Sequence, residues 1–286
     1  MSISTKTTLT ELSTLATIEG LSHIPFINIW QPLIAQKVVP MGSYGIVLPI
    51  YDEADVAGAG TEGTDYDTIT TFQTTGNTIT VAEQVAIIQL TKQARIQTVG
   101  DQVMEASRRL AEMINLKQAS LIRTACNSWT QTTGVAGTAM AASNLEEALG
   151  YLNAANAPRP YNMIAGKELI YGPKGITTKI FGLSNNQYAI PAGNVVDSFS
   201  RTGLVMIVNG FNVYLDGKIV EDASNDMYAY FFSRDAVAWG NQEGGDFSIT
   251  ANEDASLRAL ELVATNYGGS AIYMNSYGVL GIFDVV

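Results

Sequence analysis

The chain has 286 residues, 47% of them hydrophobic and only 15% charged, and its formal net charge at pH 7 is −11. A chain of this length can bury a sizeable core in one or two domains. Its negative surface repels phosphate backbones, which excludes non-specific nucleic-acid binding as the direct function. The sequence has no long apolar run and no signal-peptide pattern, so we expect a protein that neither crosses a membrane nor is secreted.

The single cysteine and the single histidine exclude whole classes of chemistry. With Cys126 alone, no disulfide can form within the chain and no thiolate metal cluster can be built. Because His23 is the only histidine, nearly every possible catalytic or zinc site lacks the usual general base or metal ligand. We expect Cys126 to be a small buried side chain and His23 to lie in an arm held by a neighbour. The sequence therefore predicts no catalytic residue, no cofactor-binding residue, no metal ligand and no cofactor.

The N-terminal residues 1–37 carry no long periodic pattern, although residues 8–18 could form a short helix. Pro25 and Pro32 break the following segment into extended pieces. Between them we expect four exposed apolar side chains, Phe26, Ile27, Ile29 and Trp30. Such a segment cannot bury these side chains by itself, so we interpret it as an arm on a neighbouring surface, with disorder as the alternative.

β-Branched and aromatic runs dominate residues 38–90 and favour strands. Residues 68–72 and 78–81 alternate with period two, and residues 74–77, TTGN, are interpreted as a turn around Gly76. The simplest assembly is a long, mostly polar hairpin, which is marginal by itself in water. It must lie either on its own domain or on another subunit.

Residues 58–63, GAGTEG, match the GxGxxG spelling of dinucleotide-binding loops, and Glu83 follows about 20 residues later. That motif functions only where a strand leads into a helix whose N-terminus holds the pyrophosphate. Here a strand pattern follows, and the surrounding acidic residues would repel phosphate. A flexible loop tip is the better interpretation, with a dinucleotide enzyme as the rival. The acidic residues are Asp52, Glu53, Asp55, Glu62, Asp65 and Asp67.

The longest predicted element is a helix over residues 101–127, which contain neither glycine nor proline and are rich in good helix formers. Asp101 is the expected N-cap. Glu105 precedes Arg109 by one turn in the favourable order. At 1.5 Å per residue, such a helix would run roughly 40 Å, which is long for a globular domain.

One face of this helix is predicted to be apolar and buried. The polar face is interrupted by Leu116 and Ile122, so we expect a second contact there. The predicted buried face consists of Val103, Ala106, Leu110, Met113, Ile114, Leu121 and Ala125.

The next segment, residues 128–142, is predicted to be a loop rich in Thr, Gly and Ala. Ser143 and Glu146 form a predicted capping box that begins a helix ending near residue 155. Its expected apolar face contains Leu145, Leu149 and Leu152.

Short elements follow this helix. Residues 162–166, NMIAG, indicate a buried strand, residues 167–171 a brief helix ended by Gly172 and Pro173, and residues 174–203 a loop-rich segment.

Turn signals then punctuate a β-rich C-terminal part. Asn209 and Gly210 lie between two apolar runs and predict a hairpin with a type I′ turn. A second turn is expected at residues 216–217. One further strand is predicted over residues 227–240, and long strands over residues 255–286.

Adjacent acidic residues are the remaining candidates for catalysis. A glycosidase needs two carboxylates on opposite sides of one pocket, but these acids lie in predicted loops or on a solvated helix face, where solubility is the better explanation. No calcium-loop, GxSxG or Walker pattern is present. The acids are Asp52 with Glu53, Asp65 with Asp67, Glu146 with Glu147, Glu253 with Asp254, and Asp235.

The ordered combination of elements resembles the major capsid proteins of tailed bacteriophages, the Hong Kong ninety-seven-type fold that encapsulin nanocompartments share. The resemblance covers roughly residues 20–286 and is one of architecture, with no catalytic motif. Besides the long helix, it rests on residues 38–65 with their strand return, 143–166 (SNLEEALGYLNAANAPRPYNMIAG), 203–215 (GLVMIVNGFNVYL), 229–240 (AYFFSRDAVAWG) and 267–282 (YGGSAIYMNSYGVLGI).

The resemblance implies an α+β chain of four parts. They are an N-terminal arm (residues 1–37), an extended β-hairpin loop (38–82), a peripheral domain (83–142 and 251–286) with a spine helix at about 101–127, and an axial domain (143–250).

The resemblance also implies a function. Such proteins self-assemble as pentamers and hexamers into an icosahedral head shell around packaged double-stranded DNA, with no sequence-specific binding and no membrane. Portal and scaffolding proteins are the expected partners, and cement proteins are a further candidate. The location would be the virion capsid, after synthesis in the host cytoplasm. An encapsulin-type shell enclosing a cargo enzyme is the alternative.

Two family features are not expected in this chain. One branch crosslinks a lysine of the extended loop to a neighbour's asparagine, but no lysine lies between Lys37 and Lys92. Other members carry a scaffolding segment ahead of the arm. Met1 lies only a short distance before the arm here, so we expect any scaffolding protein to be separate.

Overall fold

The structure is a computed structural model that describes most of the chain. The described residues are 16–17, 28–51, 74–93, 102–179, 204–254 and 258–286. The predicted helix at 8–18 and the strand at 68–72 therefore lie largely or wholly outside them.

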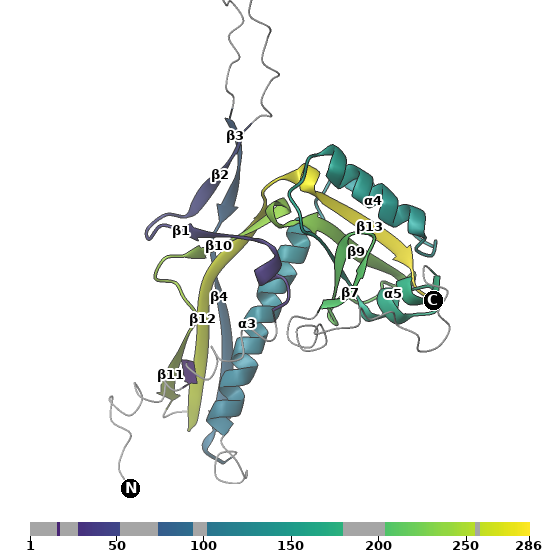
Figure 1. The fold of residues 1–286 in the computed structure, drawn as a ribbon. Coiled ribbons are helices and arrows are strands. Elements are labelled where there is room, and N and C mark those ends of the chain that lie inside the picture. Colours follow the sequence, from purple (N-terminus) through teal and green to yellow (C-terminus); the bar gives the residue numbers. More distant parts are fainter. Residues whose placement is uncertain (1–15, 18–27, 52–73, 94–101, 180–203, 255–257) are drawn as a thin grey trace, which may run out of the picture.

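The described strands form a five-stranded sheet, a six-stranded sheet and a two-stranded ribbon (Figure 1). In the five-stranded sheet, β12 is the central strand. β4 pairs with one edge of β12, while β11 and then β10 pair with the other edge, and β1 adds to β10 in parallel. The bounds are β1 (Ala35–Val39), β4 (Ala82–Thr91), β10 (Val237–Gln242), β11 (Ser248–Asp254) and β12 (Ala259–Ile272).

The long helix α3 (Gln102–Cys126) packs along one face of this sheet, against β12 and β4 (Figure 1). The predicted helix is confirmed to within one residue at each end, and Ile122 makes the expected second contact as a fully buried side chain. The predicted N-cap, Asp101, lies outside the described residues.

The predicted buried face of α3 is wrong at Met113, which is 47% exposed. The buried face includes Ala111 beside Leu110, so its centre lies on the side of Leu110 away from Met113. It also contains the polar residues Ser107, Asn115 and Gln118, which a pattern of apolar residues alone does not include.

The six-stranded sheet has the order β5-β13-β9-β6-β8-β7 and is accompanied by α4, which contacts β5, β13 and β9. The strands are β5 (Gln131–Thr133), β6 (Tyr161–Ala165), β7 (Leu204–Val208), β8 (Phe211–Leu215), β9 (Asp226–Ser233) and β13 (Gly278–Asp284). The helices are α4 (Ala142–Ala154), α5 (Lys167–Tyr171) and α6 (Ile176–Lys179).

Several local predictions for this part are confirmed. The strand β6 is buried throughout, and α5 has the predicted bounds. Asn209 and Gly210 have φ values of 45° and 84°, as a type I′ turn requires. Leu145 and Leu152 of α4 are fully buried, and Leu149 is half-buried.

Three predictions in the same region are wrong. β5 forms within the predicted loop 128–142 because β13 supplies a parallel partner. The expected Ser143 capping box is absent from the start of α4. Instead the helix begins at Ala142, and Asn144 Oδ1 accepts a hydrogen bond from the Ala141 amide at 2.9 Å. The single strand predicted over 227–240 is two strands, β9 and β10, which belong to different sheets.

The ribbon pairs β2 (Gly45–Tyr51) with β3 (Thr74–Thr80) in antiparallel register. The turn predicted at residues 74–77 is therefore wrong, because these residues begin β3 and Gly76 lies opposite Pro49. A side chain at Gly76 would approach Val47 Cγ1 to 2.6 Å, so the glycine is explained by close strand packing. The ribbon projects away from both sheets (Figure 1).

The base of the ribbon packs on its own chain, which decides between the two alternatives left by the sequence for this part. Leu48 and Ile79 are buried against Ala238 on the face of the five-stranded sheet opposite α3. Gly240 and Gly269 are cross-strand partners at the crossing. A Cβ on Gly269 would lie 2.0 Å from the Thr80 carbonyl oxygen, so only glycine permits this approach.

The arm segment also folds onto its own chain, so the prediction of an exposed Trp30 is wrong. The Trp30 side chain is 1% exposed, and its ring lies 5.2 Å from Tyr230 and 6.1 Å from Phe232. Its Nε1 donates to Asp216 Oδ2 at 2.7 Å. Ile29 is half-buried, whereas Phe26 and Ile27 lie outside the described residues. The indole ring is buried because it packs against aromatic residues of β9 in the larger apolar core of the chain.

Candidate assembly surface

The sequence-derived catalytic candidates do not converge on a site. His23, residues 58–63 with the GxGxxG spelling, and the acids between residues 52 and 67 lie outside the described residues. Cys126 is a buried free thiol, as predicted, and burial raises its pKa well above the ordinary value. A neutral, buried thiol is a poor nucleophile.

The described acidic pairs belong to the surface or to structural contacts. Glu146 and Glu147 lie on the exposed side of α4, where Glu147 Oε2 accepts a 2.6 Å hydrogen bond from Thr133 Oγ1. Glu253 is exposed on β11 and Asp235 is half-buried beside β10. Within the described part of the chain, no three His, Cys, Asp or Glu side chains are grouped to hold a metal ion. No helix there is long and apolar enough to cross a membrane.

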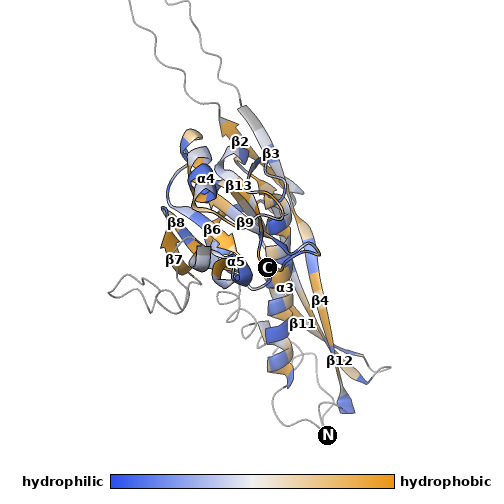
Figure 2. Cartoon of the chain, turned by 90° about the vertical axis from the view of Figure 1, so that its right-hand side faces the viewer, coloured by the Kyte–Doolittle hydropathy of each residue, from blue (hydrophilic) through white to orange (hydrophobic). Residues whose placement is uncertain are grey.

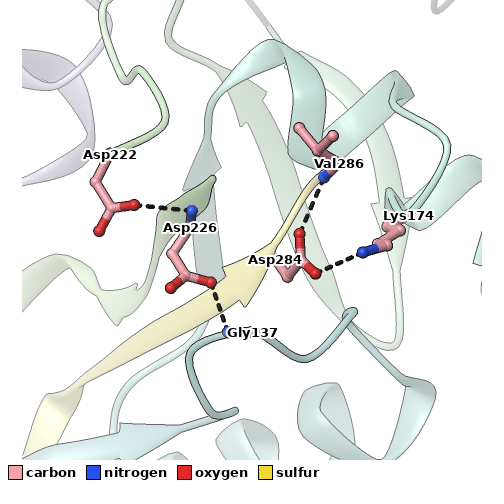
Figure 3. Close-up of polar contacts among 6 residues, drawn as sticks. All are labelled: Gly137, Lys174, Asp222, Asp226, Asp284 and Val286. Atoms are coloured by element: carbon pink, nitrogen blue, oxygen red, sulfur yellow. Dashed lines mark hydrogen bonds and ion pairs between the residues drawn. The ribbon is translucent and has the colours of Figure 1, made fainter. Parts of the chain in front are cut away.

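Carboxylates do gather where β9 begins and β13 ends, but they accept hydrogen bonds from backbone amides (Figure 3). The buried Asp226 accepts from the Gly137 amide at 2.7 Å. Asp222 accepts from the Ser224 amide at 2.8 Å and from the Asp226 amide at 2.9 Å. These bonds close the turn before β9 and fasten the loop after β5 to it.

The third carboxylate, Asp284, fastens the C-terminus (Figure 3). It forms an ion pair with Lys174 and accepts a 3.0 Å hydrogen bond from the Val286 amide. The hydrogen bond from Lys174 lowers the Asp284 pKa below its ordinary value, and the Val286 amide adds to this. A carboxylate held ionised by an ammonium group is suited to stabilise structure and unsuited to proton transfer near neutral pH.

The features that do point to a function are exposed apolar surfaces, and the first is a sheet face. On β4, Gln84, Ala86 and Ile88 point toward α3, while Val85 and Ile87 point to the opposite side and are 51% and 55% exposed. Cross-strand pairing places Ile87 beside Val263 of β12, which pairs with Thr250 of β11, and Val85 beside Thr265. We call these five residues, Val85, Ile87, Thr250, Val263 and Thr265, the open face.

The open face is bordered by polar side chains that bond to each other. Tyr267 donates to Glu83 Oε1 at 2.9 Å, and Gln89 bonds to Glu261. The carboxylates at both ends of the apolar row therefore already have partners, and the row itself carries no charge. A neutral apolar sheet face costs little to desolvate and suits contact with another protein. In Figure 2, apolar residues alternate with polar ones along β4.

The second surface lies around the base of the ribbon. Tyr44 is 87% exposed, Met41 74%, Val38 66% and Val47 60%. These side chains come from β1, β2 and the turn that joins them. Large apolar side chains exposed together over one short stretch mark a contact surface.

The charges in the sequence around the ribbon are all of one sign. Between Lys37 and Lys92 the sequence holds seven acidic residues and neither lysine nor arginine. Copies of the chain would therefore repel one another if these regions met face to face. A partner surface for this stretch must be neutral or basic.

Sequence reasoning did not identify the open face, although a signal existed. The run VAEQVAIIQL has apolar residues on both faces of a strand, as expected where both faces are covered. The structure shows α3 on one face only, and which face α3 covers depends on the tertiary fold.

Comparison with known proteins gives agreement in structure alone. No protein-family model matches the chain, and no curated protein sequence matches it. The head structure of Helicobacter pylori bacteriophage KHP40 superposes with a TM-score of 0.67 at 10% identity over 91% of each chain. The capsid of cyanophage P-SCSP1u gives 0.62 at 12% identity, over 87% of this chain and 86% of that one. The SrpI encapsulin of Synechococcus elongatus PCC 7942 gives 0.64 at 12% identity over 91% and 89%.

Proposed function

We propose that this chain, which has the Hong Kong ninety-seven-type capsid fold, is the major capsid protein of a tailed bacteriophage. Copies of it would form pentamers and hexamers that close an icosahedral head around packaged double-stranded DNA. Its place would be the virion capsid, after synthesis in the host cytoplasm. The alternative is an encapsulin-type shell around a cargo enzyme, since the SrpI encapsulin is as similar in structure as the phage capsids are.

The observation that carries the proposal is the incomplete burial of one half of the molecule. The open face and the apolar side chains around the ribbon base are exposed in a single chain, and a shell of identical copies would cover them. The low share of charged residues supports this interpretation, because a weakly charged surface is cheaper to desolvate over many contacts.

The parts of the fold can be assigned by the sheet to which they belong. The ribbon β2–β3 is the proposed extended loop, and the five-stranded sheet with α3 is the proposed peripheral domain. The six-stranded sheet with α4 is the proposed axial domain. Pairing within the six-stranded sheet supports including β5 and β13 in the proposed axial domain, and pairing within the five-stranded sheet supports including β10 in the proposed peripheral domain. The residue boundaries proposed from the sequence run differently at these strands.

No catalytic step is part of the proposed function. Portal and scaffolding proteins are proposed partners, and cement proteins could cover apolar surface that remains on the assembled shell. An overall negative charge would let packaged DNA move along the inner wall without adhering to it.

The test is to produce the full chain together with the neighbouring genes of its own genome and to examine purified particles by negative-stain microscopy. We expect closed shells with nuclease-protected DNA in the same fractions. Closed shells that carry one co-purifying enzyme and no protected DNA would establish the alternative. A protein that stays monomeric at high concentration would contradict both.

A further inference from the structure

The helix α3 is attached to its sheet through two apolar clusters that meet different parts of its length. Leu110 and Ile114 pack in one cluster with Leu262 of β12. Ile122 belongs to the second cluster, which also contains Trp239. The first cluster reaches Ile114 on α3 and Ala264 on β12, and a Cβ on Gly268 of β12 would lie 2.3 Å from the Trp239 ring of the second cluster. We infer that the residues directly after the first cluster on the two elements lie at one level.

Amide side chains occupy that level. Asn115 follows the first cluster on α3 and is 1% exposed. Asn266 follows the first cluster on β12 and is 5% exposed, and Gln84, its cross-strand partner on β4, is 4% exposed. We call Gln84, Asn115 and Asn266 the amide layer.

The amide layer is only partly hydrogen-bonded by protein. Gln84 Nε2 donates to the Gly268 carbonyl at 3.3 Å. Among the described residues, no protein partner meets Gln84 Oε1, Asn266 Nδ2, or either polar atom of Asn115. Gln118, on the same face of α3, differs because its Oε1 accepts from Asn28 Nδ2 at 3.1 Å. Buried polar atoms in folded proteins are nearly always paired, with protein or with ordered water.

We propose that the amide layer is a binding site for internal water. The unpaired atoms are two acceptors, Gln84 Oε1 and Asn115 Oδ1, and two donors, Asn115 Nδ2 and Asn266 Nδ2. Water can both donate and accept, so about one or two molecules, each with about three hydrogen bonds, satisfy this set. An ion would meet groups of the wrong polarity on half of the site.

The bound water joins α3 to β4 and β12 at the boundary between the two apolar clusters. Hydrogen bonds through water are directional, whereas apolar contacts are not. The site therefore helps to fix the register of the helix on the sheet, a role that does not depend on the proposed function of the whole chain.

The thermodynamic test uses Asn115→Leu, Asn266→Leu and the double variant in the full chain, with matched assembly state. In a hydrated layer, each leucine removes a partner of the water, so the thermal midpoint should fall by roughly 2–4 °C. The double variant should fall by less than the sum, since both changes break one network. Leu145→Ala on α4, which packs on the other sheet, is the control, and its effect should add to that of Asn266→Leu.

Two results would overturn the proposal. A raised midpoint for either leucine variant would mean that the amides are dry, because replacing an unpaired buried polar group with an apolar one relieves a penalty. The second readout is a map that resolves ordered water. Density about 2.7–3.2 Å from Asn115 and from Asn266 or Gln84 is expected. A protein side chain in that position, for example from residues 18–27, would show that the site does not bind water.

Discussion

The two sheets of this chain differ in how completely the chain covers them. All five residues of β6 are buried, as are all but one residue of β9, so the centre of the six-stranded sheet is covered on both faces. On β4 of the five-stranded sheet, burial alternates, and the side away from α3 remains exposed at Val85 and Ile87. The chain itself thus buries both faces of the six-stranded sheet at its centre, whereas one face of the five-stranded sheet remains exposed and available for contact with another surface.

Two segments connect the halves. The C-terminal turns of α3 belong to the apolar cluster that contains Trp239, while its N-terminal turns belong to the cluster that contains Leu262. In the N-terminal segment, Trp30 packs in the cluster that contains Trp239, and β1 begins a few residues later in the five-stranded sheet. The following predictions test which contacts stabilise the single chain and which are available for assembly, from the largest expected effect to the smallest.

Trp30→Ala should have the largest effect on the isolated subunit. It removes a fully buried indole and leaves the Asp216 carboxylate, 7% exposed, without that donor. We expect a loss of about 3–5 kcal/mol in the free energy of unfolding, measured by denaturant titration. Trp30→Phe keeps the aromatic packing and loses only the indole N–H, so it should cost less. Parent-like stability of Trp30→Ala would mean that the arm is bound to a neighbour and not to its own core.

Leu110→Ala should cost about 2–5 kcal/mol, since Leu110 is fully buried between α3 and the sheet. Met113→Ala is the matched control on the same helix. Because Met113 is 47% exposed, its truncation should change stability by no more than about 0.5 kcal/mol. Equal losses in both variants would place the buried face of α3 where the sequence pattern predicted it.

Shortening residues 57–65 to a brief Gly-Ser turn should leave the thermal midpoint of the subunit unchanged and prevent normal particles. The ribbon base keeps Leu48 and Ile79 on its own sheet, so the monomer retains its core. Light scattering and microscopy measure assembly, and a Gly-Ser replacement of equal length separates the role of length from that of sequence. Normal particles would contradict a bridging role for the loop. An unfolded monomer would show that the loop belongs to its own core.

Asp284→Asn should have the smallest effect, and one that depends on pH. The folded-state pKa of Asp284 is lowered by Lys174, so the ion pair stabilises the fold above the unfolded pKa of about 3.9. This contribution is lost as the pH falls through the folded pKa. The variant should therefore be less stable than the parent near neutral pH, and the difference should disappear in acid. Denaturation midpoints at several pH values test this, and a difference that grows in acid would contradict it.

Elements with local signals were predictable from the sequence. The absence of glycine and proline gave α3 its length, and Gly172 and Pro173 gave α5 its end. Asn209 and Gly210 gave the type I′ turn, because few other residue pairs adopt positive φ at both positions. In each case the information lies within a few residues of the element.

The errors share the opposite property. Residues 74–77 form a strand because β2, which precedes them in the chain by more than 20 residues, supplies their partner. The strand predicted at 227–240 is two strands because its two halves have different partners. The first half, β9, pairs with β13 and β6, whereas the second half, β10, pairs with β12 and β1. Trp30 is buried because Tyr230 and Phe232 lie where the arm passes.

The sequence alone determined the long helix α3, the short helix α5, the turn at Asn209 and Gly210, and the resemblance to a shell protein. Only the tertiary structure decided which apolar residues are covered by the chain and which, like Ile87, remain for another surface. It also decided that three polar residues of α3, Ser107, Asn115 and Gln118, are buried. The physical reason is that helix and turn preferences act between near neighbours, whereas burial depends on surfaces brought together from distant parts of the chain.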